Sequence, residues 1–335
     1  MAERWPTADR WISLHAFFRG DTDRLLTQAV GGLVRELSAE GRLDRFFFLR
    51  YWEGGPHVRL RLLPHSPACA ALVEQRTKST VEQHLAGHPT VTSWDRERYA
   101  RLAERLAQLE GRRGYDRRLR PDGCVEPVPY RPEHDVFGGP EVTDAVERHF
   151  HDSSRLALAA LGRDGDRGRL LGYASTALML ALAVWEPDPR RMGGLLARAR
   201  DRWDPQPQRA RRAEVFARQH EALTGQAERC WRVASCTDPA GARGLAGAWW
   251  RSLETLHQQV VAHQQAGRFH PARTGSTLRA LDAGSPPERN DVLILLIRCV
   301  HLLCNRLGLS ASDEGHLRYL TGATLGELAQ KEGTP

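Results

Sequence analysis

The chain has almost no lysine: its cations are nearly all arginines, and lysine occurs only at Lys78 and Lys331. None of its 6 cysteines belongs to a C-x-x-C pair, which argues against a zinc site and a disulfide framework. No phosphate-binding loop, helix-turn-helix, zinc-finger or RNA-binding aromatic motif is present. The net charge of +7 is compatible with an anionic partner, either a nucleic acid or an acidic peptide, and the missing motifs leave nucleic acid without support, so we expect no nucleic-acid partner.

The sequence also lacks an apolar run long enough to span a bilayer, and its start, MAERWPTADRW, lacks the basic and apolar segments of a signal peptide. We therefore expect a cytoplasmic protein with no membrane contact. With 335 residues, of which 41% are hydrophobic, the chain can bury a large core. No cluster of metal-binding residues stands out in the sequence, and we expect neither a metal nor a cofactor.

The most informative segment is RFFFLRYWEGGPHVRLRL, residues 45–62. RFFFLRYW is apolar and aromatic, EGGP is a turn and HVRLRL alternates strictly, so the segment predicts a β-hairpin. The alternation places His57, Arg59 and Arg61 on one face of the second strand. Like charges this close are unfavourable unless an anion, or developing negative charge, lies against them, which indicates a site. The alternative is a solvated strand face.

The N-terminal half follows the order β, α, β, β, α, β. WISLHAFF at 11–18 alternates like a strand, 21–41 is an amphipathic helix and 68–110 is helical. CVEPVPY at 124–130 has the pattern of a further strand, and its prolines place it at a sheet edge. This order is typical of the ferredoxin-like arrangement.

From residue 141 onward, apolar residues recur every three or four positions, which predicts an almost wholly helical half. The predicted helices cover 142–161, 169–184, 190–203, 210–222, 244–266, 290–307 and 310–321. The helix at 290–307 contains the apolar run VLILLIRCVHLLC, so we expect it at the centre of the core. The predicted fold class is α+β: a ferredoxin-like portion, 1–140, packs against a mostly α-helical portion, 141–335, in one compact domain.

Four segments resemble the lantibiotic dehydratase C-terminal, or elimination, domain family. FFFLRYWEGGPHVRLRL resembles its signature hairpin, and WISLHAFF resembles its opening strand. HFHDSS, with the pair Asp152 and Ser153, resembles the F-x-x-D-S element, and HLLCNRLG at 301–308 resembles the C-terminal H-x-x-x-N-R helix. The segments occur in the family's order and span nearly the whole chain, so the resemblance implies the family's fold.

The resemblance implies a catalytic role for the strand arginines Arg59 and Arg61 and for the helix histidine His301. In this family the domain removes an activated side chain from a modified serine or threonine, which leaves a dehydro-amino acid. PEHDVFGG at 132–139 matches the family's E-x-x-R-Y-G-G element but has Val136 in place of the arginine. An elimination needs a cation to hold the leaving glutamate carboxylates, and valine supplies none.

The family also includes free-standing thiopeptide pyridine synthases, and the missing arginine makes the chain resemble this branch. Such an enzyme joins two dehydroalanines of a thiazole-containing peptide by a formal aza-Diels–Alder cycloaddition. Loss of water and of the leader-peptide amide then completes the pyridine and the macrocycle. The resemblance thus implies a peptide-modifying cyclase or lyase of ribosomal peptide antibiotic biosynthesis. A free-standing glutamate-elimination enzyme and a non-enzymatic scaffold are the alternatives.

The partner that the resemblance implies is a precursor peptide with an acidic leader and a core of thiazoles and dehydroalanines. Contact with upstream biosynthetic enzymes is also expected. The basic loop at 112–120 is a candidate contact for the leader, and the edge strand at 124–130 could take up the leader by strand addition. A flexible solubilising loop is the alternative for 112–120.

On the helix at 290–307, Arg298, His301 and Asn305 share one face. We expect this polar edge to line the same cavity as the strand arginines. The structural alternative for His301 is a buried histidine whose ring is satisfied by a backbone carbonyl.

Tyr319 and Ser285 complete the candidate catalytic residues. Tyr319 is a candidate acid, with a packing role as the alternative, and Ser285 lies where a helix N-terminus offers free amides to an oxyanion. Trp52 and Trp11 could form an aromatic floor for thiazole rings, with core packing as the alternative. The other candidate substrate-binding residues are His57, Arg50, Arg298, Asn305 and Arg306.

Overall fold

The computed structural model describes residues 10–90, 94–109, 111–112, 114–163, 166–198, 209–236, 243–272 and 287–330. Its internal contacts divide the chain into two compact units. The sheet unit comprises Met1–Pro132 and Ala157–Arg163, and the helical unit comprises Glu133–Leu156 and Asp164–Pro335. The domain boundary at residue 140 that the sequence indicates stays a prediction.

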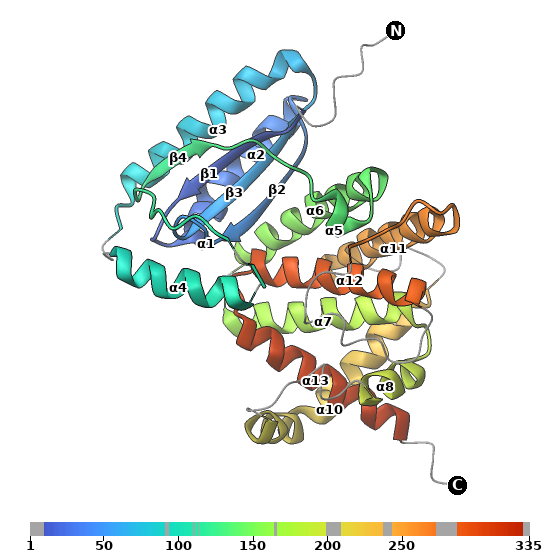
Figure 1. Cartoon of the computed structure of the whole chain (residues 1–335). Helices are drawn as coiled ribbons and strands as arrows, with labels where there is room; N and C mark the ends of the chain where they lie inside the picture. Colours follow the sequence, from blue (N-terminus) through green and yellow to red (C-terminus); the bar gives the residue numbers. More distant parts are fainter. Residues whose placement is uncertain are drawn as a thin grey trace. The chain divides into compact units, whose positions relative to one another are not determined.

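The sheet unit is built on a 4-stranded antiparallel sheet of order β2-β3-β1-β4 (Figure 1). The strands are β1 (Ile12–Phe17), β2 (Leu43–Tyr51), β3 (His57–Pro64) and β4 (Cys124–Pro127). The helical segments are α1 (Thr22–Arg24), the π-helical turn η2 (Leu25–Val30), α2 (Gly31–Ala39), α3 (Pro67–Gly87) and α4 (Arg96–Leu109). This order confirms the ferredoxin-like prediction, and β4 lies at a sheet edge, as its prolines indicate.

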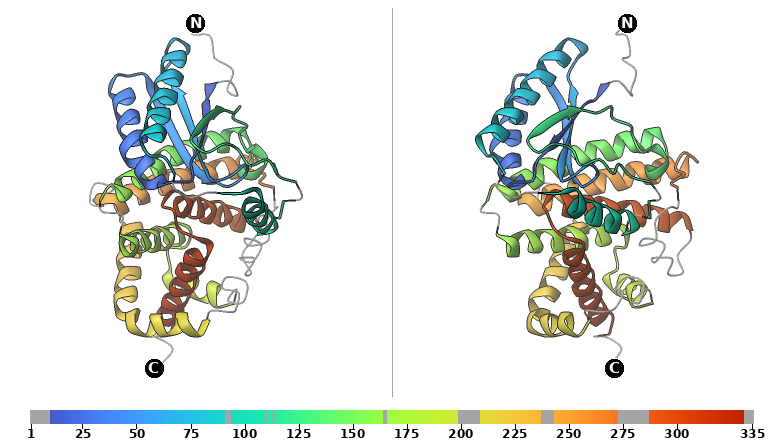
Figure 2. Two further views of the ribbon diagram at one scale, coloured as in Figure 1. Left: turned by 90° about the vertical axis from the view of Figure 1, so that its left-hand side faces the viewer. Right: turned by 60° about the vertical axis from the view of Figure 1, so that its left-hand side comes forward.

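The two faces of the sheet differ in character. Figure 2 shows α2 and α3 side by side on one face of the sheet. The even-numbered residues of β1 and β3, such as Leu14 and Leu60, are buried apolar residues, except for the half-buried Ile12. Because successive strand residues point to opposite faces, the odd-numbered residues of β1 and β3 occupy the other face. Alternation in the sequence therefore decides which side chains belong to the candidate site.

The helical unit contains α5 (His134–Phe137), α6 (Pro140–Leu161), whose last turn belongs to the sheet unit, α7 (Arg167–Trp185) and α8 (Pro189–Arg198). It continues with α10 (Arg209–Ala234), α11 (Gly244–Gln265), α12 (Pro287–Arg306) and α13 (Ala311–Gln330). The α+β class that the sequence predicts is confirmed.

Two helices extend further than the sequence predicts. α10 continues through Gly225, and α13 continues through Gly326, although glycine lowers helix stability in isolation. These two helices pack against each other and against α7, and tertiary packing overrides the local preference. The predicted helix at 190–203 is present as far as Arg198, and residues 199–203 lie outside the described part of the chain.

The central helix of the helical unit is α7, not α12 as the sequence indicates. α7 contacts α10, α11, α12 and α13, and it buries residues on every side. It also has the length and apolar composition of a membrane span, so the expectation that no run reaches this length is wrong. In the protein, 67% of that window is buried. A helix that is apolar all round is typical of a core enclosed by other helices.

Candidate active site

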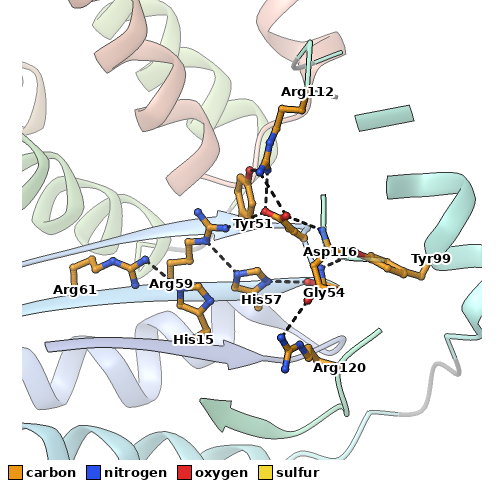
Figure 3. Close-up of polar contacts among 12 residues, drawn as sticks. His15, Tyr51, Gly54, His57, Arg59, Arg61, Tyr99, Arg112, Asp116 and Arg120 are labelled. Atoms are coloured by element: carbon orange, nitrogen blue, oxygen red, sulfur yellow. Dashed lines mark hydrogen bonds and ion pairs between the residues drawn. The ribbon is translucent and has the colours of Figure 1, made fainter. Parts of the chain in front are cut away.

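The odd-numbered residues of β1 and β3 bring two histidines and two arginines to one face of the sheet (Figure 3). The antiparallel register puts His15 opposite Arg59, and Ser13 opposite Arg61. Directly opposite residues share a face, and His57 shares it because it precedes Arg59 by two positions. The row predicted from HVRLRL is present, and His15 adds to it. The alternation of WISLHAFF is the sequence signal that could have identified His15.

The two imidazoles lie within hydrogen-bonding distance of the two guanidiniums. Nδ1 of His57 donates to the carbonyl oxygen of Gly55 at 2.8 Å, because a carbonyl can only accept. Nε2 of His57 is therefore the acceptor for Nε of Arg59, at 3.3 Å. Nη2 of Arg61 lies 3.1 Å from Nε2 of His15. The two imidazole rings stack with their centroids 4.8 Å apart.

Burial keeps both imidazoles neutral. Loss of water, followed by the positive charge of Arg61, lowers the pKa of His15 to about 2. Burial is also the largest of the causes that lower the pKa of His57 to about 4. His57 and Arg61 are only 4% and 7% exposed, so the alternative of a solvated strand face is wrong for both. The face thus presents two guanidinium charges beside two neutral nitrogen acceptors.

We expect acid to destabilise the protein as soon as the pH falls below about 6.5, the ordinary pKa of histidine. The buried side chains of His15, His57 and His149 have pKa values of about 2, 4 and 3 in the folded chain. The unfolded chain therefore binds more protons, and the free energy of unfolding falls as the pH falls from 6.5 toward 4. Each histidine should remove about 1 kcal/mol between about pH 6.5 and 5.5.

Urea unfolding at a series of pH values measures this loss. Arg148→Ala provides the control, since an exposed arginine keeps its charge throughout this pH range and its loss should leave the pH dependence of the wild type unchanged. A urea midpoint that stays constant between about pH 7 and 5 would contradict three buried neutral histidines.

Glu53, in the hairpin turn, ties the basic loop to the sheet. It accepts hydrogen bonds from Nη1 of Arg112 at 2.9 Å and from the backbone N–H of Asp116 at 2.8 Å. Arg112 also donates to the hydroxyl of Tyr51 at 2.6 Å, and the guanidinium of Arg59 lies 3.4 Å from the centroid of that ring. These contacts hold the loop against the turn, and they disfavour the flexible-loop alternative.

The two tryptophans of the expected aromatic floor are core residues. Trp52 is buried and packs with Tyr99 in an apolar cluster of the sheet unit. Trp11 packs edge-on against Phe47, with ring centroids 5.1 Å apart. These positions fit the core alternative. Arg50 forms an ion pair with Asp23. Substrate contact by Trp52 and Arg50 stays a prediction.

His301 is an exposed residue of α12, so the alternative of a buried histidine is wrong. Its side chain is 58% exposed, and its Nδ1 lies 2.9 Å from a carboxylate oxygen of Glu314 in α13. Asn305 on α12 and Tyr319 on α13 are both half-buried. Ser285 lies outside the described residues, and its role stays a prediction.

Arg298 reaches the segment that resembles E-x-x-R-Y-G-G. Its Nη1 donates to the carbonyl oxygen of Val136 at 2.8 Å, and burial lowers the pKa of its guanidinium. A cation from α12 therefore lies at the segment that has valine where the family has arginine. That Arg298, His301 and the arginines of the sheet line one cavity stays a prediction.

Arg306 joins two of the sequence motifs inside the helical unit. Its Nε donates to Oγ of Ser154 at 3.1 Å, and its Nη1 donates to Oγ of Ser153 at 3.3 Å. Burial lowers the pKa of Arg306 to about 9. HFHDSS and HLLCNRLG therefore meet in the core. This environment favours a structural role for Arg306, and its contact with substrate stays a prediction.

Replacing Arg306 with alanine should lower the free energy of unfolding by about 2–4 kcal/mol. The change leaves a cavity and removes the donors to two buried serine hydroxyls. Urea unfolding measures the loss, and Arg148→Ala, at an exposed ion pair on α6, should change stability by less than about 0.5 kcal/mol. A stable Arg306→Ala protein with weakened substrate binding would instead favour a substrate contact.

The sequence and the fold are similar to those of known proteins. Residues 11–325 match the family described as lantibiotic biosynthesis dehydratase C-term. The chain therefore belongs to the lantibiotic dehydratase C-terminal family. No curated protein matches it significantly. Among the described residues, no group of three or more histidine, cysteine, aspartate or glutamate side chains is placed to hold a metal ion.

Several solved structures share the fold. Pyridine synthase TbtD from thiomuracin biosynthesis is 20% identical, with a TM-score of 0.74 over 96% of this chain and 99% of that chain. TsrL is 20% identical, with a TM-score of 0.65 over 95% of this chain and 94% of that chain. The tRNA-dependent lantibiotic dehydratase MibB from Microbispora sp. 107891 is 19% identical, with a TM-score of 0.59 over 99% of this chain and 29% of that chain.

Proposed function

We propose that this protein is a thiopeptide pyridine synthase of the cytoplasm. It closes a macrocycle by a formal aza-Diels–Alder cycloaddition of two dehydroalanines in a thiazole-containing precursor peptide, and then expels water and the leader-peptide amide. Family membership and the likeness in fold to a pyridine synthase support a peptide-modifying enzyme. The observation that carries the choice of cycloaddition over elimination is Val136, which has no guanidinium to hold a leaving carboxylate. The cation near it, Arg298, donates to the carbonyl oxygen of Val136 itself.

The cycloaddition requires that the two dehydroalanines be positioned and that protons be transferred. Holding two distant residues of one peptide together can remove about 7–11 kcal/mol of barrier. Arg59 and Arg61, oriented by the neutral imidazoles, polarise the amide oxygen that becomes an iminol. His301 moves the protons, a role that typically contributes about 10²–10⁴-fold, and Tyr319 is a candidate acid.

Mass spectrometry of two incubations tests the proposal. A leader-bearing thiazole peptide with two dehydroalanines should lose water and release the leader as a carboxamide. A peptide with glutamylated serine should remain unchanged. Formation of dehydroalanine from the glutamylated peptide would overturn the proposal in favour of elimination. Binding of the leader without either reaction would overturn it in favour of a scaffold.

The basic loop and the edge strand β4 are proposed to hold the acidic leader. Arg117 and Arg118 of the loop are exposed. β4 lies at the edge of the sheet, so an extended leader can pair with it as an added strand. Replacing both arginines with glutamine should raise KM several-fold and leave kcat unchanged, because exposed ion pairs contribute about 0–1 kcal/mol each. The KM increase should shrink at high salt.

Steady-state kinetics with the leader-bearing substrate measures this effect. Replacing Arg101 and Arg105 of α4 with glutamine removes the same charge from the same unit, and should leave KM unchanged. Equal KM values for the loop variant and the wild type would exclude the loop from leader binding.

A further inference from the structure

We infer that Glu314 is a positioning residue for His301: its carboxylate fixes the imidazole proton on Nδ1, so that Nε2 carries the lone pair used in proton transfer. The inference rests on the proposed function, because it assigns His301 the proton transfers of the cycloaddition. The sequence gives no hint of this pairing, since Glu314 lies 13 positions beyond His301 and on a different helix.

Both carboxylate oxygens of Glu314 lie within hydrogen-bonding distance of one ring nitrogen of His301. Nδ1 of His301 lies 2.9 Å from Oε2 and 3.0 Å from Oε1 of Glu314. An ionised carboxylate only accepts, so the shared proton belongs to Nδ1. The side chain of Glu314 is 19% exposed, whereas that of His301 is 58% exposed. The side chain of Glu314 is therefore more buried than the imidazole that it orients.

The turn before α13 fixes the backbone of Glu314. Ser310 and Asp313 cap each other: the Ser310 backbone N–H donates to Asp313 Oδ2 at 2.7 Å, and the Asp313 backbone N–H donates to Ser310 Oγ at 3.3 Å. The backbone N–H of Glu314 donates to the carbonyl oxygen of Ser310 at 3.0 Å. Arg167 of α7 donates to the same Asp313 carboxylate at 2.6 Å. Glu314 therefore belongs to a well-anchored turn.

This arrangement suits a base that later acts as an acid. When Nε2 takes the amide proton of the substrate, the N–H bond of the substrate breaks, an Nε2–H bond forms and the ring becomes an imidazolium. The carboxylate of Glu314 stabilises that new charge at close range. The imidazolium then returns the proton to the departing oxygen or nitrogen, so the ring is neutral again. A group that orients a catalytic imidazole through Nδ1 is a recurring device in proton transfer.

The test combines kinetics with a spectroscopic measurement on the full chain. Glu314→Ala should lower kcat about tenfold or more and leave KM within about twofold, because proton transfer loses an oriented base. In the ¹⁵N spectrum, the imidazole of His301 should shift from the Nδ1–H tautomer toward Nε2–H. Glu314→Gln keeps an acceptor oxygen without charge, so it should keep the Nδ1–H form and show an intermediate kcat. It also provides a near-isosteric variant should the alanine protein fail to fold.

The matched control is Glu327→Ala on the same helix, which removes one carboxylate elsewhere and should change neither kcat nor the spectrum. A Glu314→Ala enzyme with wild-type kcat would overturn the inference, and so would an unchanged tautomer. If the wild-type protein fails to act on the peptide with two dehydroalanines, the proposed function is overturned. An active wild type with an unaffected Glu314→Ala variant overturns the positioning role alone.

Discussion

Replacing Arg61 with lysine is expected to lower kcat for the cycloaddition about 100- to 1,000-fold, the range found when one preorganised donor to an oxyanion is lost. Nη1 of Arg61 donates to the carbonyl oxygen of Leu60 at 3.2 Å while Nη2 lies 3.1 Å from Nε2 of His15. Lysine keeps the charge but replaces the planar fork with a compact ammonium, so it does not reproduce both contacts. Product formation followed by mass spectrometry measures the rate.

The control for this exchange is Arg76→Lys. Arg76 lies on α3 of the same unit and forms exposed ion pairs with Glu36 and Glu40, so the exchange should leave kcat unchanged. Thermal unfolding separates lost chemistry from lost folding. Arg59→Lys gives a second test at a more exposed position. Wild-type kcat in folded Arg59→Lys and Arg61→Lys proteins would exclude both arginines from the reaction.

Replacing His301 with alanine is expected to lower kcat about 10²–10⁴-fold, the usual contribution of a general acid or base. The same change should lower stability by less than about 1 kcal/mol, because the side chain is largely exposed and so is its share of the ion pair with Glu314. With 58% of the His301 side chain exposed, little packing is lost. A large loss of kcat with a small loss of stability is expected of a residue that acts in the reaction and contributes little to packing.

Turnover of the leader-bearing peptide and urea unfolding measure the two effects. His65→Ala is the matched control, since this exposed histidine pairs with Asp44 in the sheet unit and should leave kcat unchanged. His301→Phe provides a second variant that retains a ring without proton-transfer capacity. Full activity of both His301 variants would exclude His301 from the proton transfers.

Local signals in the sequence were enough to predict much of the sheet unit. Strict alternation in HVRLRL identifies the face that carries His57, Arg59 and Arg61, and the glycines of EGGP identify the turn. The prolines of the last strand indicate its edge position. These features depend on residues close in sequence, where steric and hydrogen-bonding preferences are strongest.

The sequence alone determined the ferredoxin-like order, the helical second half and the cationic strand face. Three features depend on long-range contacts: His15 lies opposite Arg59, Arg306 is buried against Ser154 and α7 is the central helix. Such contacts join residues far apart in the chain, and their energetics depend on burial, which no local pattern encodes. The neutral state of His15 has the same origin: its pKa falls because the folded chain removes water from the ring.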